Sequence, residues 1–341
     1  MKETPFFWKT DLDTIAAWAG KASRAEVKSL CKTAGGRDLL AFFYGEKQVF
    51  DSRANYSSAC GAHDKSCYAP VTGKKPVVIL LGAVHGGETE GTAALVNLIS
   101  LLETGVDLKG ERHDELTTLC EKARLVIIPV CNPDGRVRVK LQTMLGCTFE
   151  ELRYWMQGTW KDGSLCGWPD CKKRHPIKDY VDFLGGYYND DGINLMHDNF
   201  FHPMASETQA LMDLCDNEHA DWILHLHGGG NSVNALLQTS YVTQECQRAI
   251  CELQKVCDEE AQKYGLRFAT VSETERESGR TPPSFNLTSA LHHVCGGVSA
   301  VFESNERIVD MKGELFTHEQ VYLSHLILFT QCLKLAVGAR D

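Results

Sequence analysis

The chain has 341 residues, of which 43% are hydrophobic and 23% charged, and its formal net charge is −10 at pH 7. This is ordinary for a soluble globular protein, and without a long basic block it argues against a nucleic-acid or anionic membrane partner. No segment approaches the ~18 uninterrupted apolar residues of a membrane span, and residues 1–9 carry no apolar stretch of the kind found in signal peptides. We therefore expect a cytoplasmic protein.

The fourteen cysteines include no CxxC pair. Many lie within apolar patterns, such as Cys131 after a Val/Ile run and Cys332 among leucines. Cysteines in such positions behave as small hydrophobic residues. We expect buried, reduced thiols, which agrees with a reducing compartment.

Apolar runs rich in branched residues alternate with helical periodicity along the chain. They predict strands at 39–44, 76–81, 125–130, 222–226, 235–242 and 298–302, and helices at 93–102, 148–157, 206–215, 243–264 and 317–336. Segment 158–190 is rich in Gly, Pro, aromatic and charged residues, which predicts a long surface excursion. The alternation predicts an α/β fold, with a mostly parallel sheet between helices. No repeat or linker divides the chain, so a single domain over 1–341 is expected, with 1–74 as a lead-in segment.

Helix starts can be assigned from capping residues. Thr148 followed by Glu151, and Thr317 followed by Gln320, are typical of capping boxes. Ser206 is the expected N-cap of the helix that follows it.

Polar groups follow several predicted strands, at the sheet edge where ligands gather in α/β folds. His85 and Glu88 are three residues apart in a glycine-containing turn and can converge on one cation. Zinc binds imidazole and carboxylate ligands, and a catalytic zinc site uses three protein ligands. His227, which ends a strand before three glycines, is the expected third ligand, while His225 lies on the same strand face and is the alternative.

Glu303 ends the last predicted strand. A zinc site lowers the pKa of bound water, but a base must still take the proton. Glu303 is the candidate for that base.

In this order, the motifs resemble those of the zinc metallocarboxypeptidase family. The resemblance rests on His85–Glu88, Asn132–Gly135, Gly192–Phe200, His227-Gly228 and Glu303. It implies a mixed eight-stranded sheet between helices and one zinc ion per chain. It also implies a zinc-bound water activated by Glu303, which then delivers the proton to the leaving amine.

The chain departs from the family pattern in the segment from Asn194 to Phe200. The family's Asn-Arg pair, which grips the terminal carboxylate of the substrate, is missing, and Asn194 stands where the family has an aspartate that orients the first histidine. No tyrosine matches the family's mobile substrate-binding tyrosine. Candidate substrate-binding residues are Arg174, with Lys172 beside it, Arg280 and Asn132.

The expected function is zinc-dependent hydrolysis of a peptide or amide bond. The short Gly82–Glu88 segment is similar to that of bacterial family members that cut cell-wall peptides, so such peptides are among the expected substrates. The alternatives are a zinc-dependent deacylase of N-acyl amino acids, or a non-catalytic descendant that binds zinc or another ligand.

Overall fold

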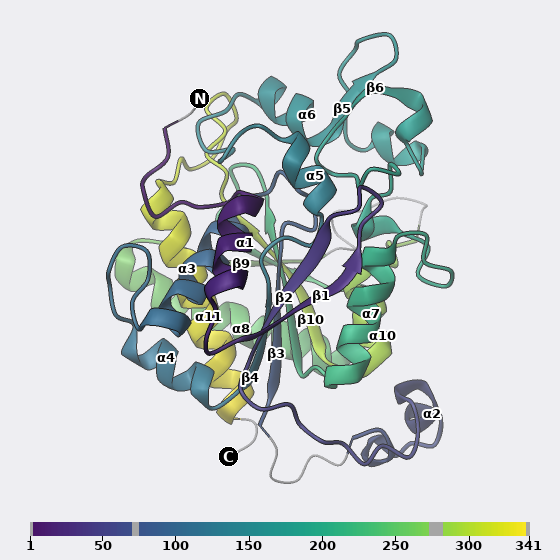
Figure 1. The fold of residues 1–341 in the computed structure, drawn as a ribbon, viewed down its shortest axis with the longest axis vertical. Coiled ribbons are helices and arrows are strands. Elements are labelled where there is room, and N and C mark those ends of the chain that lie inside the picture. Colours follow the sequence, from purple (N-terminus) through teal and green to yellow (C-terminus); the bar gives the residue numbers. More distant parts are fainter. Residues whose placement is uncertain (1–2, 70–74, 273–281, 339–341) are drawn as a thin grey trace.

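An eight-stranded sheet runs through the molecule in the computed structural model, which describes residues 3–69, 75–272 and 282–338 (Figure 1). The strand order is β1-β2-β4-β3-β7-β10-β8-β9. The four central strands are parallel, whereas β1 and β2 join antiparallel on one side and β8 pairs antiparallel with β10 on the other. The strand bounds are β1 Glu26–Lys32, β2 Asp38–Tyr44, β3 Val77–Gly82, β4 Arg124–Ile128, β7 Trp222–Gly228, β8 Ala235–Gln238, β9 Ala269–Ser272 and β10 Val298–Ser304. The mixed eight-stranded sheet implied by the sequence is confirmed.

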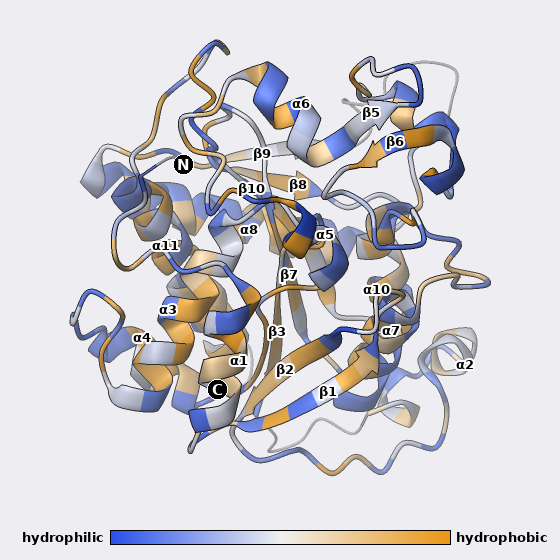
Figure 2. Ribbon diagram, turned by 45° about the horizontal axis from the view of Figure 1, so that its top comes forward, coloured by the Kyte–Doolittle hydropathy of each residue, from blue (hydrophilic) through white to orange (hydrophobic). Residues whose placement is uncertain are grey.

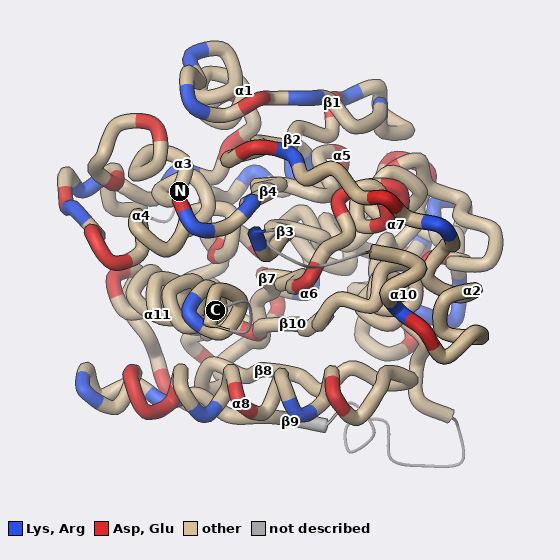
Figure 3. The backbone as a smooth tube through the Cα atoms, turned by 90° about the horizontal axis from the view of Figure 1, so that it is seen from below, with Lys and Arg blue, Asp and Glu red and all other residues tan. Residues whose placement is uncertain are grey.

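Helices cover both faces of this sheet (Figure 1). One face carries α1 (Leu12–Lys21), α3 (Glu90–Thr104), α4 (Asp114–Glu121), α8 (Gln244–Ala261) and α11 (His318–Gly338). The other carries α2 (Tyr56–Gly61), α7 (Ser206–Glu218) and α10 (Leu287–Cys295). Lys, Arg, Asp and Glu lie mostly on the helices and connecting segments, as the view along the layers shows (Figure 3).

The central strands are apolar without alternation because both of their faces are covered. In β3 all six residues are buried. Val78 and Leu80 pack into the core on one side of the sheet, while Val77, Ile79 and Leu81 pack into the core on the other. Figure 2 shows these strands as the hydrophobic centre of the fold.

Two of the three predicted helix starts are confirmed. Thr148 and Glu151 form a capping box at α6 (Phe149–Gln157), and Thr317 and Gln320 exchange the same two hydrogen bonds at α11. The prediction for Ser206 is wrong, because the N-cap is Ala205. Ser206 instead donates from Oγ to the carbonyl of Lys32 at 2.7 Å, which ties α7 to β1.

By length and composition, α11 could cross a membrane, yet 67% of its apolar window is buried inside the fold. All fourteen cysteines lie within the described residues; their thiols are free, and ten of them are buried. These features match a core helix and the buried, reduced thiols expected from the sequence.

The 158–190 segment is more than a surface excursion. It forms a small antiparallel pair, β5 (Gly158–Trp160) and β6 (Val181–Leu184), which lies with α6 above the carboxyl ends of the large sheet (Figure 1). Its far end returns to the sheet, where Gly186 accepts a hydrogen bond from the Gly86 N–H at 2.7 Å. Shorter elements complete the fold: α5 Pro133–Arg138 and the 3₁₀ turns η1 Lys65–Cys67, η2 Asp170–Lys173, η3 Lys178–Tyr180, η4 Leu195–His197 and η5 Gln262–Tyr264.

Candidate active site

The candidate residues gather at the carboxyl ends of three adjacent parallel strands. In the register of β7 and β10, Glu303 lies opposite His227. On the other side of β7, Gly82 at the end of β3 lies opposite Leu226, which brings the turn with His85 and Glu88 to the same edge.

His85, Glu88 and His227 converge as predicted. The Glu88 carboxylate accepts from both imidazoles, at 2.8 Å from His85 Nδ1 and 2.7 Å from His227 Nδ1. The three donor atoms all lie within 4.8 Å of one another. His225 is outside this group, since it is fully buried with Nε2 3.2 Å from Ser299 Oγ. The geometry therefore favours His227 over His225 as the third candidate ligand.

The charge on Glu88 is maintained by its two imidazole neighbours. Burial alone would raise the pKa of Glu88, but His85 and His227 hold it at about 2. Two imidazole nitrogens and one carboxylate oxygen are the donor set of many catalytic zinc sites. Because the shared hydrogen bonds already hold these atoms within reach of one cation, the residues fit zinc.

Asn194, which stands where the family has an aspartate, still contacts the ring of His85. Its Oδ1 lies 3.2 Å from His85 Nε2, on the side of the ring away from Glu88. The amide oxygen can only accept a hydrogen bond, so it fixes the orientation of His85 without adding a negative charge. The Asn194 N–H in turn donates to His175 Nε2 at 2.8 Å.

Three glycines pack backbone to backbone behind the His85 turn. A Cβ added to Gly86 would lie 2.2 Å from the Arg136 nitrogen, and one on Gly135 would lie 2.3 Å from the Gly186 oxygen. A Cβ on Gly186 would lie 3.1 Å from the Gly87 nitrogen. These approaches leave no room for side chains, and they join the His85 turn, α5 and the end of the 158–190 segment into one unit.

Glu303 is half-buried at the end of β10, next to the converging ligands. A Cβ added to Gly229 would lie 2.8 Å from Glu303 Oε2, so the glycine after His227-Gly228 leaves space for this carboxylate. The arrangement places a carboxylate reachable from solvent beside the candidate metal centre.

Two further carboxyls near the site are buried and poorly suited to carry charge. Burial raises the pKa of Glu306 well above its usual value, with Glu90 and Glu88 adding to the effect. Burial likewise raises the pKa of Glu90 to about 7. Glu306 Oε2 accepts the Gly230 N–H at 2.7 Å, which fixes the turn after β7.

The sequence interpretation missed Tyr187, which comes from the returning 158–190 segment. Its ring lies 4.1 Å from that of His85, and burial, together with Glu88, Glu306 and Glu303, raises its pKa well above the usual value. A neutral phenol therefore lies among the candidate catalytic groups. The glycine pair immediately before it was the available signal in the sequence.

His197 stands on η4, in the segment that departs from the family pattern. Its Nδ1 lies 3.3 Å from Ser284 Oγ. Burial lowers the pKa of His197 well below its usual value, and the neighbouring Lys172, His85 and His175 act in the same direction. A neutral imidazole, with Lys172 nearby, therefore lies close to the site where the sequence lacks an arginine.

The residues predicted to bind substrate do not gather at the candidate metal centre within the part of the chain that the structure describes. Asn132 is fully buried. Its side-chain amide accepts a hydrogen bond from the Gly135 N–H at 2.8 Å and donates one to the Gly186 oxygen at 3.3 Å, so it supports the backbone. The prediction that Asn132 binds substrate is therefore wrong. Arg174 is exposed, with its guanidinium 5.3 Å from the Tyr180 ring, and we find no contact between it and the candidate metal ligands among the described residues. Arg280 lies outside the described residues.

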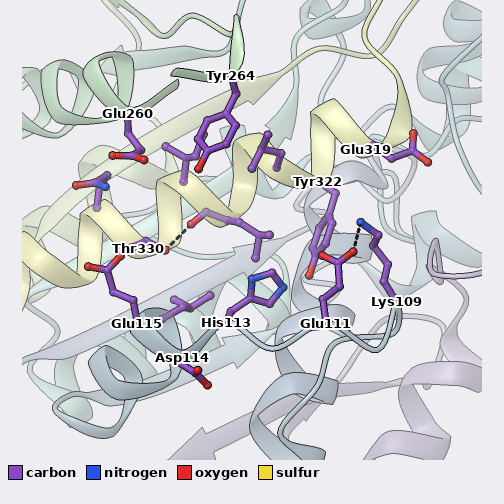
Figure 4. A pocket seen from close by; sticks show the side chains of 15 residues that line it. Lys109, Glu111, His113, Asp114, Glu115, Glu260, Tyr264, Glu319, Tyr322 and Thr330 are labelled. Atoms are coloured by element: carbon purple, nitrogen blue, oxygen red, sulfur yellow. Dashed lines mark hydrogen bonds and ion pairs between the residues drawn. The ribbon is translucent and has the colours of Figure 1, made fainter. Parts of the chain in front are cut away.

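A second His/Asp/Glu group lies away from this edge, beside a cavity of about 480 Å³ that α4, α11 and η5 line (Figure 4). Both oxygens of Asp107 are already engaged, one with the N–H groups of Lys109 and Glu111 and the other with His113 Nε2 and the Tyr322 hydroxyl, both at 2.9 Å. Glu111 pairs with Lys109 at 2.8 Å. This group is a hydrogen-bonded support for the loop between α3 and α4.

Comparison with known proteins agrees with the fold. A family model described as zinc carboxypeptidase matches residues 13–316. No curated protein sequence matches the chain. Among solved structures, a metallo-carboxypeptidase from Burkholderia cenocepacia superposes with a TM-score of 0.59 at 15% identity, over 96% of this chain and 68% of that one.

Two animal proteins share the same fold. Carboxypeptidase A from Helicoverpa armigera gives a TM-score of 0.56 at 12% identity, over 98% of this chain and 75% of that one. Bovine thrombin-activatable fibrinolysis inhibitor gives 0.57 at 12% identity, over 98% of this chain and 100% of that one. The chain belongs to the zinc carboxypeptidase family, whose members are hydrolases with a single catalytic zinc ion.

Proposed function

We propose that this chain hydrolyses a peptide or amide bond at a zinc ion held by His85, Glu88 and His227, with Glu303 as general base. The observation that carries the proposal is the convergence of the three donor atoms within 4.8 Å, with Glu303 opposite His227 on the adjacent strand. A chain that only bound a ligand would have no need of a carboxylate beside the metal ligands.

The bound zinc would supply Lewis acidity, lowering the pKa of water and polarising a carbonyl. Glu303 takes the proton from the attacking water and delivers it to the leaving amine. Its half-exposed position allows both transfers, and burial keeps Glu306 from competing as a base because its pKa is raised. Asn194 holds the His85 ring in the orientation that directs Nδ1 toward Glu88.

Tyr187 is the proposed donor to the substrate carbonyl. The family resemblance also implies an arginine that polarises the scissile carbonyl, and it has no clean counterpart in this sequence. Tyr187 brings a neutral phenol to the same group of side chains as His85 and Glu303. A donor fixed where charge develops stabilises the transition state more than the ground state.

The substrate class follows from what the segment after Asn194 lacks. Met196 and His197 stand in place of the family's Asn-Arg pair, and Met196 is buried. Without a fixed guanidinium, recognition of an ordinary C-terminal carboxylate is weakened. We therefore propose an amide or isopeptide substrate, with cell-wall-type peptides as the first class to be screened.

We also propose a single catalytic domain and a cytoplasmic location. The first is supported by one sheet that contains strands from both ends of the chain. The second is supported by the fourteen free thiols, since such thiols persist in reducing compartments.

The test is metal content and hydrolysis measured on the same preparations of wild type and Glu303→Gln. We expect about one zinc per chain in both proteins, with hydrolysis reduced by about 10²- to 10⁴-fold in the variant. If Glu303→Gln retains zinc and hydrolyses substrate as fast as wild type, Glu303 is not the general base. Wild-type protein that takes up no zinc even when it is added back would contradict the proposed function.

A further inference from the structure

His175 is connected to His85 by two consecutive hydrogen bonds. Its ring is half-buried, and Nε2 accepts the backbone N–H of Asn194 at 2.8 Å. The side-chain oxygen of Asn194 in turn lies 3.2 Å from His85 Nε2. A residue from the middle of the 158–190 segment is therefore linked to an imidazole of the candidate metal centre.

The side chain of Asn194 must be held in one orientation to serve His85. Nδ1 of His85 faces Glu88, so when Nδ1 binds a metal the ring proton is on Nε2, which then has to donate. A carboxylate offers two equivalent acceptor oxygens, whereas an amide offers one oxygen and a nitrogen that only donates. The Asn194 oxygen also accepts the Met196 N–H at 3.0 Å, which prevents the amide from turning over. Its position therefore depends on the backbone around Asn194.

His175 fixes that backbone. Asn194 is the N-cap of η4, and the N–H of such a residue has no partner within its own turn, so the imidazole supplies one. Burial lowers the pKa of His175, although Asp198 acts in the opposite direction, so Nε2 carries no proton near neutral pH and can accept. Ile177 is fully buried and its N–H donates to the Gly192 carbonyl at 2.9 Å, so the imidazole is carried by a fixed segment.

Loss of the acceptor at position 175 would be felt at His85. The Asn194 N–H would be left without its partner at a part-buried position, which favours a shift of the backbone toward another acceptor. Such a shift moves the amide oxygen away from His85 Nε2. The His85 ring would then be held by Glu88 on one side only.

We propose that His175 is a positioning residue for the candidate metal centre, acting through Asn194 to fix the ring of His85. This inference rests on the proposed function, because it assigns His175 to the zinc site of that function. The 158–190 segment then supports the site at two points, since Gly186 also accepts the N–H of Gly86, the residue after His85.

The first measurement is zinc affinity, by competition with a chromogenic chelator, for wild type, His175→Gln and His175→Asn. The glutamine amide can place its oxygen where Nε2 lies, whereas the asparagine amide is one methylene shorter, so the two variants are a matched pair. We expect His175→Asn to weaken zinc binding by about 10-fold, as for loss of an outer contact to a zinc ligand, and His175→Gln to bind zinc like wild type. His175→Phe, which offers no acceptor and excludes water, should behave like His175→Asn. His202→Asn is the control, because His202 is exposed, and it should leave zinc affinity unchanged.

A double-mutant cycle tests whether His175 acts through Asn194. In Asn194→Ala the contact with His85 is already lost, so adding His175→Asn should weaken zinc binding no further. An equal effect of His175→Asn with and without the Asn194 side chain would overturn the inference. Equal losses in His175→Gln and His175→Asn would also overturn it, because they would assign the ring to packing.

The imidazole nitrogen resonances of His85 in metal-free protein separate this inference from the proposed function. They should shift in His175→Asn and match wild type in His175→Gln, whether or not the protein hydrolyses any substrate. If these shifts and the zinc losses occur but no peptide or amide is hydrolysed, the role of His175 stands and the proposed function fails. If wild type takes up no zinc, the proposed function fails and the resonances alone decide. Identical His85 resonances in all three proteins would show that His175 does not position His85.

Discussion

At the scale of single residues, the sequence predicted the convergence of the candidate metal ligands better than the positions of the candidate substrate-binding residues. His85, Glu88 and His227 could be predicted because each lies at or just after the carboxyl end of a buried strand, so their convergence comes from the sheet. Tyr187 could not, because its ring reaches His85 only through the return of a segment about a hundred residues later in the chain. Periodicity could not decide between His225 and His227, because the two residues lie on the same face of β7. The decision required knowing how far each side chain lies from the carboxyl end of the strand.

Replacing His227 by alanine should remove zinc, because one of three ligands and its bond to Glu88 are lost. His225→Gln should retain zinc, since His225 contacts Ser299 in the core. Elemental analysis of both purified variants checks this. Loss of zinc from His225→Gln in a protein whose circular dichroism is unchanged would reverse the assignment.

Tyr187→Phe should lower kcat by about 10²-fold, as for loss of one transition-state donor, with KM and zinc content close to wild type. The ring against His85 is kept, so only the hydroxyl is tested. Tyr188→Phe is the matched control, because Tyr188 is buried in the small cluster with Cys171, with its ring centroid 6.4 Å from that of Tyr187. Equal losses of kcat in the two variants would assign both tyrosines to packing.

At the scale of elements, the turn between β1 and β2 is joined to α5 and the 158–190 segment by one buried carboxylate. Asp134 accepts from Thr33 Oγ1 at 2.5 Å, the Gly35 N–H at 2.9 Å, Arg37 at 2.8 Å and the Asp190 N–H at 3.1 Å. Sequence composition predicted only a surface excursion for 158–190, because Gly, Pro and charged residues favour loops whether or not the loop packs on a site. The hydrogen bonds that fix it join segments far apart in the sequence.

Asp134→Asn should lower the free energy of unfolding by about 2 kcal/mol, the usual contribution of hydrogen bonds to a charged group. Burial alone would raise the pKa of Asp134, but the bonds from Thr33 and Arg37 hold it below its usual value. A lowered folded-state pKa gives stability that is present above the unfolded pKa of about 3.9 and is lost as the pH falls through the folded pKa. Urea unfolding between about pH 2 and pH 5 should therefore show a shallower pH dependence in the variant, and an unchanged slope would contradict this role.

At the scale of the whole molecule, the fold class could be predicted because the central strands are continuous apolar runs. The two edge strands of the sheet could not be predicted, because β1 is partly exposed along its length and β9 has only four residues. Helices α1 and α10 were missed because each is short and lies next to loop-like sequence. Short and half-exposed elements depend on neighbours that a local pattern does not show.

The thiols give a measure of how tightly the whole molecule is packed. Cys251 is exposed, Cys31, Cys60 and Cys67 are intermediate, and the other ten are buried. Burial raises the pKa of the Cys120 thiol to about 12, which lowers its reactivity. Titration of native protein with a chromogenic disulfide should label Cys251 first and at most four thiols quickly, and all fourteen after denaturation. Rapid labelling of more than four in folded protein would contradict this packing.

The contact among Gly86, Gly135 and Gly186 has a consequence for how such a sequence can change over generations. Each glycine is required by the backbone of another segment, so an alanine at any one position pushes apart two segments that are distant in the gene. A lineage that kept the 158–190 segment should retain all three glycines together. One that deleted the segment would release Gly135 from its contact with Gly186, while Gly86 would still be constrained by Arg136. Gly135 should therefore be retained wherever the segment is retained, while Gly86 should persist in both kinds of lineage.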